Sequence, residues 1–392
     1  MFQKILKKIK PADKEELLVS LKVTSFLELL KKEVKNNEVI IGGSFAKGTW
    51  LKGNHDIDVF IAFKNNEEMS NTLEKSIKKS FKKVERIHGS RDYFLVKYKG
   101  LNFELVPVLK IEKAEAAENI TDVSPMHVYW VKKNSNSFLN DEIRVAKYFL
   151  KVHGFYGAET YIGGFSGYVV EILVIHYNGF LKFIKGAAEW KQGKIIDIEG
   201  KNKFTNEQKF PLIVIDPVQP ERNAAAALTG EKFNALVELC KTMNKKQEEF
   251  YFKEKKVNIK KYDLVFKVKV LKGNKDVVGT KILKVFEKIK FQLAAKDFEI
   301  VDAGWSWKEE AYLYYNVKKK QLSNYIQHNG PPLHLVQDVE SFKNKYKNYK
   351  IKNEGKRISV ELPRKIKNLR DFTKEILKDE YIKIRIKSIK VM

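Results

Sequence analysis

The sequence predicts a multidomain α+β protein with an α/β head, a mainly helical middle domain and a basic α+β body at the C-terminal end. Three observations support this fold class. The 392 residues exceed the usual length of one domain. Alternating apolar runs, typical of strands, occur mostly in the first and last thirds, whereas the apolar spacing of the middle third is helical. We place the domains at 1–137, 138–252 and 253–392.

The head begins with a helical pattern over 14–35, where apolar residues recur every three or four positions. Short apolar runs at 38–42 and 56–63 follow and predict strands. Alternating residues at 94–100 and 101–111 predict two more strands joined by a turn. A helix that leads into several strands indicates an α/β domain.

The middle domain contains two strong helical patterns. The first, NDEIRVAKYFLKVHG, has a start signal at Asn140 and Asp141 and a stop at Gly154. The second spans 229–252. Between them, FPLIVIDPVQPERN predicts a strand followed by a loop that prolines punctuate.

The most apolar long segment is 161–184, which carries Glu171, His176 and Asn178 near its centre. A bilayer core penalises such groups, so we interpret the segment as a buried helix capped by Ser166. The start of the chain lacks the apolar core of a signal peptide. The one cysteine leaves no internal disulfide, so we predict a cytoplasmic protein with no membrane partner.

The last part is rich in lysine and predicts strands within 260–273, 298–317 and 357–363, with a helix over 279–297. Lysines and tyrosines are interspersed in YNVKKKQLSNYIQHNG and KNKYKNYKIKN, a composition suited to phosphate contact with some stacking. Double-helical RNA offers mainly phosphates, 2'-hydroxyls and a shallow minor groove. We therefore expect recognition by shape.

Basic residues outnumber acidic ones by 75 to 49, which gives a formal net charge of +26. This excess favours a polyanionic partner. Nucleic acid fits best, because 17 Tyr, 25 Phe and 5 Trp accompany the charge and aromatic rings stack on bases. An anionic membrane surface is a weaker alternative, indicated by the short basic stretch FQKILKKIK.

The stretch GGSFAKGTWLKGNHDIDVF combines a glycine turn with two aspartates. On a strand, residues two apart share a face, so Asp56 and Asp58 project together. Neighbouring carboxylates repel each other unless a cation joins them, and Mg²⁺ prefers such oxygen ligands. The turn at Gly43 and Ser44 offers backbone N–H groups and a hydroxyl to phosphate, and Lys47 adds charge.

A third carboxylate is expected for a two-metal site, and Glu104 on the strand over 101–111 could supply it. Its plainer interpretation is a solvated glutamate on an edge strand. With metal, a triphosphate and an attacking hydroxyl, the predicted reaction class is nucleotidyl transfer.

The stretch resembles the signature of the DNA polymerase β nucleotidyltransferase superfamily, and its KGTWL interior is similar to archaeal-type (class I) CCA-adding enzymes. Further segments resemble that family in the same order along the chain. They lie at 121–131, 147–180, 211–229 and 328–332.

The resemblance implies a polymerase β-like head and a C-terminal RRM-like (ferredoxin-like) fold. It implies template-independent addition or repair of the 3'-terminal CCA of tRNA from CTP and ATP, with release of pyrophosphate. The C-terminal part would hold the acceptor stem and TΨC arm of tRNA. A homodimer is compatible with this family.

The resemblance also implies roles for individual residues. Asp56, Asp58 and Glu104 would bind Mg²⁺, and Arg222 would read the edge of the incoming base. The residues implied at the nucleotide triphosphate are Gly43, Ser44, Lys47, His127, Lys147 and Tyr156. The family usually has Asp where Glu104 stands.

Four residues outside the carboxylates also have a plainer explanation. His127 could be a partly buried imidazole, and Lys147 the solvated face of its helix. Tyr156 could be a packing aromatic. Arg222 could form a surface ion pair with Glu221.

Three other functions stay open. A poly(A)-type terminal transferase of the same superfamily would need only ATP and would extend many RNAs. A catalytically silent tRNA-binding protein would keep the scaffold without the chemistry. A membrane-surface role is the third.

Overall fold

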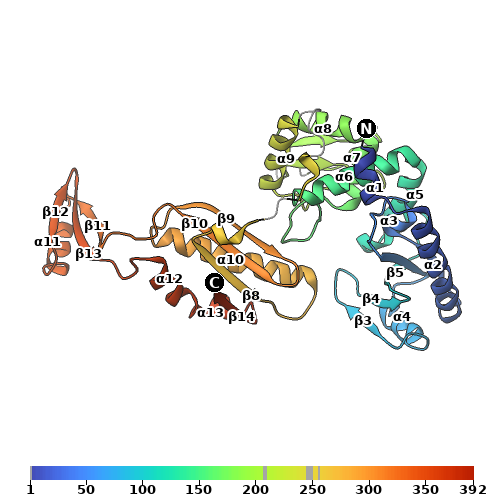
Figure 1. Cartoon of the computed structure of the whole chain (residues 1–392), viewed down its shortest axis with the longest axis horizontal. Coiled ribbons are helices and arrows are strands. Elements are labelled where there is room, and N and C mark those ends of the chain that lie inside the picture. The colour runs from blue at the N-terminus through green and yellow to red at the C-terminus, as the bar shows by residue number, and fades with distance from the viewer. Residues whose placement is uncertain (1, 206–209, 244–249, 255–256) are drawn as a thin grey trace. The chain divides into compact units, whose positions relative to one another are not determined.

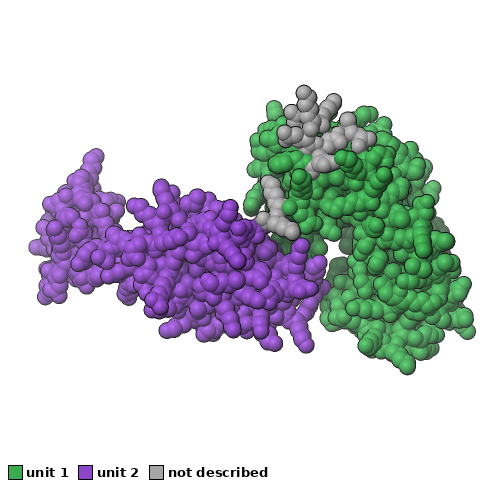
Figure 2. Space-filling model, in the orientation of Figure 1, with its two compact units in different colours: residues 1–255 green, residues 256–392 purple. Residues whose placement is uncertain are grey.

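The computed structural model describes residues 2–205, 210–243, 250–254 and 257–392. The chain divides into two compact units, residues 1–255 and 256–392, which Figure 2 shows in different colours. Each unit is described by itself. The three-domain division stays a prediction.

A five-stranded sheet forms the centre of the head in the first unit (Figure 1). Its strands are β1 (Glu38–Ile41), β2 (Asp56–Phe63), β3 (Val84–Ile87), β4 (Tyr93–Tyr98) and β5 (Leu101–Leu109). The order is β1-β2-β5-β4-β3, in which β2 and β5 pair in parallel and the other neighbours are antiparallel. The strands expected from the alternating runs are confirmed.

One face of this sheet is covered by helices α2 (Asp13–Glu33) and α4 (Met69–Ile77). Phe26 of α2 stacks on Phe103 of β5 with ring centroids 3.6 Å apart, and both side chains are fully buried. Residues of β2 and β5 alternate between the two faces. Because the apolar set Ile57, Val59 and Phe103 packs against the helices, the polar residues between them project to the other face.

The helical region follows the head and has its own core. Its elements are α5 (Ser124–Asn134), α6 (Ser137–Val152), α7 (Gly167–His176), α8 (Phe180–Ala188), α9 (Gly230–Thr242), β6 (Lys194–Ile196) and β7 (Leu212–Val214). The N-terminal helix α1 (Gln3–Ile9) packs into the same core. The second predicted helix, 229–252, ends at Thr242 as α9, and its part at 244–249 lies outside the described residues.

Helix α6 begins earlier than predicted. Its N-cap is Asn136, whose side chain accepts a hydrogen bond from Leu139 N at 2.9 Å. The start signal expected at Asn140 and Asp141 is therefore wrong, because an equally good cap lies upstream. Asp141 instead pairs with Arg144 one turn later, at 2.6 Å.

The apolar segment predicted as one buried helix forms two, α7 and α8, which meet at 92°. Asn178 and Gly179 break the helix with positive φ angles of 52° and 126°, which these two residue types tolerate. Ser166 caps α7 as expected, since it accepts from Val169 N at 3.2 Å. In the described ranges no single helix is long and apolar enough to cross a membrane, and α7 and α8 meet that length and composition only as a bent pair.

The second unit contains a four-stranded antiparallel sheet of order β14-β8-β10-β9. Its elements are β8 (Leu264–Lys269), α10 (Lys275–Ala295), β9 (Ile300–Trp307), β10 (Ala311–Val317), α12 (Leu369–Ile376), α13 (Glu380–Lys383) and β14 (Ser388–Val391). This strand, helix, strand, strand, helix, strand order is that of a ferredoxin-like fold. The predicted fold class is confirmed.

A smaller subdomain is inserted between β10 and α12. It consists of a three-stranded sheet and one helix: β11 (Tyr325–Pro332), α11 (Val336–Lys345), β12 (Ile351–Glu354) and β13 (Arg357–Pro363). Phe342 of α11 packs with Ile358 and Val360 in a separate small core. Leu322 N donates to Lys367 O at 2.7 Å, so the two connecting segments are joined where the insertion begins and ends.

Candidate active site

The glycine turn between β1 and β2 packs directly against the aspartates. Gly42 N donates to Asp58 O at 2.7 Å, and Gly43 starts the short helix α3 (Gly43–Ala46) with a φ of +60°. A Cβ atom on Gly43 would lie 1.6 Å from Asp58 Oδ2, and one on Gly42 would lie 2.3 Å from the ring of Phe60. Only glycine allows this approach, which places the backbone of α3 beside a carboxylate.

Three carboxylates lie on the face of the sheet that is turned away from α2 and α4. The parallel register puts Asp58 of β2 opposite Glu104 of β5, and Asp56 opposite Asn102. Asp56 is exposed, whereas Asp58 and Glu104 are partly buried. The structure therefore brings residues that are 46 positions apart in the chain onto adjacent strands.

The charges of these carboxylates repel one another. Burial raises the pKa of Asp58, Lys47 opposes this effect and Asp56 adds to it. Burial and then the charges of Asp58 and Asp56 raise the pKa of Glu104 to about 7. A divalent cation would relieve such repulsion, so the donor chemistry fits a hard metal ion.

The three carboxylates are not gathered into a complete metal cage. Among the residues that the structure describes, no group of three His, Cys, Asp or Glu side chains lies close enough to hold an ion. Mg²⁺ is commonly bound by one or two carboxylates together with substrate phosphates. The arrangement is consistent with that mode, and the three-carboxylate metal site stays a prediction.

Replacing Glu104 by Gln should change the pH dependence of stability in metal-free buffer. In the folded chain the carboxyl group of Glu104 has a pKa of about 7, so it stays protonated up to about that pH. In the unfolded chain it loses its proton near the usual pKa of 4.5. Wild type therefore loses stability as the pH rises between these values. Above pH 7, Glu104→Gln should be more stable by roughly 3 kcal/mol, with little difference below pH 4.5.

Urea unfolding of the first unit in EDTA, followed from pH 4 to pH 8, measures this difference. Glu85→Gln is the matched control, because Glu85 is exposed on β3 of the same sheet, with β4 between it and the strand of Glu104. A constant difference between Glu104→Gln and wild type across this range would contradict the predicted proton linkage.

A buried ionic cluster lies next to α3. Glu171 of α7 is 1% exposed and accepts from Lys147 Nζ and Thr49 Oγ1 with Oε1, at 2.8 and 2.7 Å. Its Oε2 accepts from Lys47 Nζ at 2.8 Å. Burial alone would raise the pKa of Glu171, but Lys147 and Lys47 outweigh it and lower the pKa to about 2. The two lysines are thus held side by side by one carboxylate.

Tyr156 and Ser44 border this cluster. Burial raises the pKa of the Tyr156 phenol, so the hydroxyl stays protonated. A Cβ atom on Gly167 would lie 2.9 Å from Tyr156 OH and 3.8 Å from Lys147 Nζ, so the Tyr156 hydroxyl and the Lys147 ammonium both lie beside this glycine. Ser44 follows Gly43 in α3 and is partly buried.

His127 and Arg222 both contact Asp216, which follows β7 and is fully buried. His127 Nε2 lies 3.1 Å from Asp216 Oδ2, and Arg222 Nη1 donates to the same oxygen at 2.7 Å. Tyr168 OH donates to Oδ1 at 3.0 Å, and its ring stacks on His127. The surface ion pair of Arg222 with Glu221 is wrong, because the buried Asp216 is its partner.

The pKa values fix the charges in this group. Burial lowers the pKa of His127 although Asp216 opposes the effect, so the imidazole is neutral at pH 7. Burial alone would raise the pKa of Asp216, but its contacts with His127 and Arg222 lower the pKa to about 2.

Asp122 in the motif TDVSP has a structural role. Its carboxylate accepts from the backbone N–H of Leu109, Glu118 and Asn119, at 2.7, 3.2 and 2.9 Å, and pairs with Arg91. These bonds join the end of β5 to the turn before α5. They hold α5, which carries His127, against the sheet.

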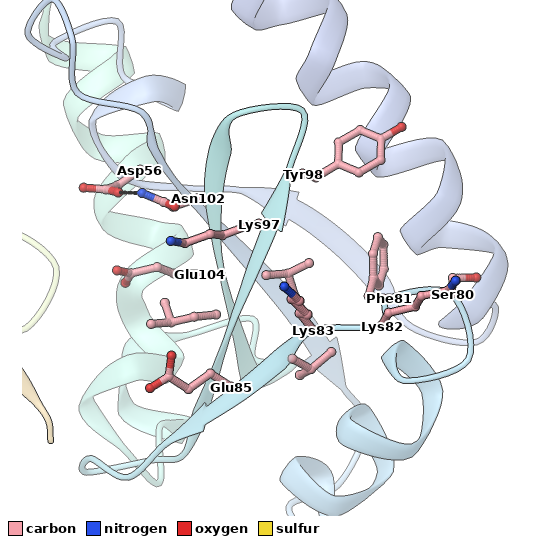
Figure 3. A pocket seen from close by; sticks show the side chains of 13 residues that line it. Asp56, Ser80, Phe81, Lys82, Lys83, Glu85, Lys97, Tyr98, Asn102 and Glu104 are labelled. Carbon is pink, nitrogen blue, oxygen red and sulfur yellow. Dashed lines mark hydrogen bonds between the residues drawn. The ribbon is translucent and has the colours of Figure 1, made fainter. Parts of the chain in front are cut away.

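A hollow of about 1030 Å³ opens beside the carboxylates, between β3, β4 and β5. Figure 3 shows Asp56, Asn102, Lys97 and Glu104 on one side of the sheet, while Tyr98 points to the opposite side. The exposed residues Lys82 and Lys83 also line the hollow. The hollow is therefore lined by both acidic and basic side chains.

Several residues of the site escaped sequence reasoning. They are Thr49, Asn102, Tyr168 and Asp216. From the sequence, Glu171 serves only as a charged group that a bilayer core penalises. A single glutamate in an apolar helix also indicates that a buried cationic or polar partner is present, and this indication could have identified the site. Asn102 and Tyr168 gave no such signal, because exposed residues of these types are common.

Three protein-family profiles match the chain in succession. Residues 23–127 match the nucleotidyltransferase domain, residues 141–253 the second domain of tRNA nucleotidyltransferase, and residues 262–383 the C-terminal domain of the CCA-adding enzyme. Together they cover most of the chain.

Curated relatives match over most of their own length. A CCA-adding enzyme of Nanoarchaeum equitans is 33% identical over 353 residues, 85% of this chain and 86% of the relative. That of Methanosarcina acetivorans is 32% identical over 371 residues, covering 87% and 80%. That of Sulfurisphaera tokodaii is 30% identical over 368 residues, covering 91% and 87%.

Solved structures share the fold of about two thirds of the chain at low identity. A cytoplasmic RNA terminal U-transferase matches with a TM-score of 0.50 and 13% identity, over 65% of this chain and 97% of that one. The Cid1 poly(U) polymerase with MgGTP bound matches with a TM-score of 0.51 and 12% identity, over 64% and 97%.

The sheet presents carboxylates beside a glycine-started turn, and Lys147 of the helical region shares Glu171 with Lys47 of the head. Together with the profile match of residues 23–127, this site defines the class of the protein as a nucleotidyltransferase. Such enzymes use a divalent metal ion. The profiles and the curated relatives then narrow the class: the chain belongs to the family of CCA-adding enzymes, the tRNA nucleotidyltransferases that act on tRNA with nucleoside triphosphates. The family that the motifs indicated is confirmed.

Proposed function

We propose that this chain adds or repairs the 3'-terminal CCA of tRNA, taking CMP and AMP from CTP and ATP without a nucleic-acid template. The observation that carries the proposal is the juxtaposition of Asp58, Glu104 and the backbone of α3 on one face of the sheet. This geometry suits the joining of a hydroxyl to a phosphorus atom that a metal-bound triphosphate presents.

We propose Asp56, Asp58 and Glu104 as the ligands of Mg²⁺. When bound, the ion would lower the pKa of the attacking 3'-hydroxyl and neutralise the triphosphate and pyrophosphate. The raised pKa values of Asp58 and Glu104 support this assignment, because burial and the neighbouring carboxylates disfavour their ionised forms and a divalent cation would favour them again. Glu104 is one methylene longer than the usual aspartate, and its place opposite Asp58 keeps it within the group.

The triphosphate would lie over α3 and the paired lysines. Gly43 and Ser44 would contribute backbone N–H groups and a hydroxyl. Lys47 and Lys147 would supply positive charge, and their shared hydrogen bonds to Glu171 support a common task. Of the remaining residues of the predicted set, Tyr156 would donate a hydrogen bond from its protonated phenol. His127 would border the triphosphate without donating to it, because the Nε2 of its neutral imidazole faces Asp216 and the ring has only one N–H group.

Arg222 would read the edge of the incoming base. Its side chain is 30% exposed and uses Nη1 for Asp216, so other guanidinium N–H groups remain for a ligand. A guanidinium fixed on one side by a buried carboxylate keeps its fork geometry, which favours selective hydrogen bonding.

The 3' end of the RNA would occupy the hollow beside Glu104. The hollow is lined by Lys82, Lys83 and Lys97, which would bind backbone phosphates of the RNA. The terminal hydroxyl of the RNA would then lie beside the neighbouring carboxylates.

The second unit would bind the acceptor stem and TΨC arm. Its basic and aromatic groups support this assignment: Arg385 lies over the ring of Tyr381 at 3.4 Å, and Lys288 approaches the same ring. A homodimer and a cytoplasmic location also stay proposals. The buried, unpaired Cys240 suits a reducing compartment.

One assay separates this function from its rivals. A tRNA transcript that lacks CCA is offered each nucleoside triphosphate singly and then CTP with ATP, and the products are resolved on a sequencing gel. We expect two C residues from CTP alone, and one A after them when ATP is added. Long A tails would identify a poly(A)-type transferase, and no Mg²⁺-dependent product would identify a silent tRNA-binding protein.

A further inference from the structure

Asn102 is the residue of β5 that faces Asp56. The parallel pairing of β2 and β5 places Asp56 opposite Asn102. This pair lies two residues before the pair of Asp58 and Glu104 on each strand. A backbone hydrogen bond of 2.9 Å from Asn102 N to His55 O fixes this register where β2 begins. Because residues two apart on a strand share a face, Asn102 and Glu104 project to the same side.

The side chain of Asn102 binds the Asp56 carboxylate. Its Nδ2 donates to Asp56 Oδ1 at 2.9 Å, as the dashed line in Figure 3 shows. Within the described part of the chain, no other side chain donates a hydrogen bond to this carboxylate. One amide bond occupies one oxygen and leaves Oδ2 available, since a carboxylate accepts about four hydrogen bonds or metal contacts.

The two aspartates of the motif are held by different means. Asp58 is confined by burial and by Gly43, which packs against its Oδ2. Asp56 is exposed at the first position of β2, so packing does little to restrict its rotation. Hydrogen-bond partners behind a ligand commonly fix the orientation of carboxylates at metal sites.

We infer that Asn102 is a positioning residue for the metal ligand Asp56. Its amide holds Asp56 on the face that Asp58 and Glu104 share, with one oxygen free for the divalent ion. An amide suits this task because it carries no charge: a carboxylate would increase the repulsion, and an ammonium group would compete with the metal. The inference rests on the proposed function and adds a residue to it.

The test measures metal affinity directly. Mn²⁺ is titrated into the full chain in the presence of a saturating non-hydrolysable CTP analogue, and free Mn²⁺ is followed by electron paramagnetic resonance. We expect Asn102→Ala to bind Mn²⁺ about 10- to 100-fold more weakly than wild type. Asn102→Ser, which keeps a shorter donor, should recover part of the loss.

A second readout excludes a merely structural effect. For Asn102→Ala, the Mg²⁺ concentration that gives half-maximal CMP transfer should rise, while the rate at saturating Mg²⁺ and the metal-free melting midpoint stay near wild type. Asn66→Ala is the control, because Asn66 is an exposed asparagine of the same domain that also donates to a carboxylate, that of Glu118.

Mn²⁺ affinity within twofold of wild type in Asn102→Ala would overturn the inference. So would a loss of activity that high Mg²⁺ does not restore, together with a lowered melting midpoint. Neither result touches the proposed function, which Asp58→Ala tests separately.

Discussion

Asp58→Ala should abolish incorporation of CMP and AMP while tRNA binding persists. The variant loses the carboxylate that lies opposite Glu104 and beside the backbone of α3. A metal ligand of this kind stabilises the transition state by several kcal/mol, so we expect the rate to fall roughly 10³-fold or more. Transfer of radiolabelled CMP to a tRNA lacking CCA measures the rate, and a filter-binding assay measures tRNA affinity.

The fold should survive this substitution. Burial raises the pKa of Asp58, so its ionised form is disfavoured in the folded chain and a neutral replacement removes that penalty. Asp58→Asn, which preserves the shape packed against Gly43, should be as inactive as Asp58→Ala and at least as stable as wild type. Asp13→Ala, at an exposed position of α2, is the control. CMP transfer at the wild-type rate by Asp58→Ala would show that the metal assignment is wrong.

Glu171→Gln should destabilise the first unit by about 3 to 5 kcal/mol. The substitution leaves Lys47 and Lys147 buried, at 9% and 2% exposure, without their shared counter-charge. Thermal unfolding should shift down by on the order of 10 °C for a unit of this size. Calorimetry that resolves the transition of the first unit measures the change.

The pH and ligand dependence identify the cause of this loss. The pKa of Glu171 is lowered to about 2, so its stabilising effect is present above its usual value of 4.5 and is lost as the pH falls towards 2. The deficit of Glu171→Gln should therefore be constant from pH 5 to pH 8. Because a triphosphate would supply negative charge to the same lysines, CTP should stabilise the variant more than wild type.

Glu189→Gln is the matched control, since Glu189 is exposed at the end of α8. A melting midpoint of Glu171→Gln within 2 °C or so of wild type would mean that solvent already compensates both lysines. If CTP raised the melting midpoint of Glu171→Gln and of wild type by the same amount, the triphosphate would not bind at Lys47 and Lys147.

Much of the fold follows from local pattern. Alternating residues predict β4 and β5, and helical spacing predicts α2, because each pattern arises from the geometry of its own element. The break between α7 and α8 was missed, since Asn178 and Gly179 are weak signals inside a strongly apolar run. Helix α6 offers two possible N-caps, Asn136 and Asn140, and the sequence alone does not show which one starts the helix. The surrounding contacts decide between them.

In the candidate active site, too, some features follow from local sequence pattern and others depend on tertiary contacts. Asp56 and Asp58 share a strand, so their common direction is readable from spacing alone. The partners of His127 and Arg222 are not readable, because Asp216 lies far from His127 in the chain and reaches it only in the folded helical region. Glu171 and Lys147 likewise meet Thr49 across more than 90 residues.

By itself, the sequence determined the class of chemistry, because a glycine turn, an aspartate pair and a large basic excess are local or additive properties. Tertiary structure alone decided how charge is balanced in the site. Burial and charge pairing depend on which distant segments come within a few ångströms of each other, and those distances decide which lysines share Glu171 and which carboxylates remain uncompensated.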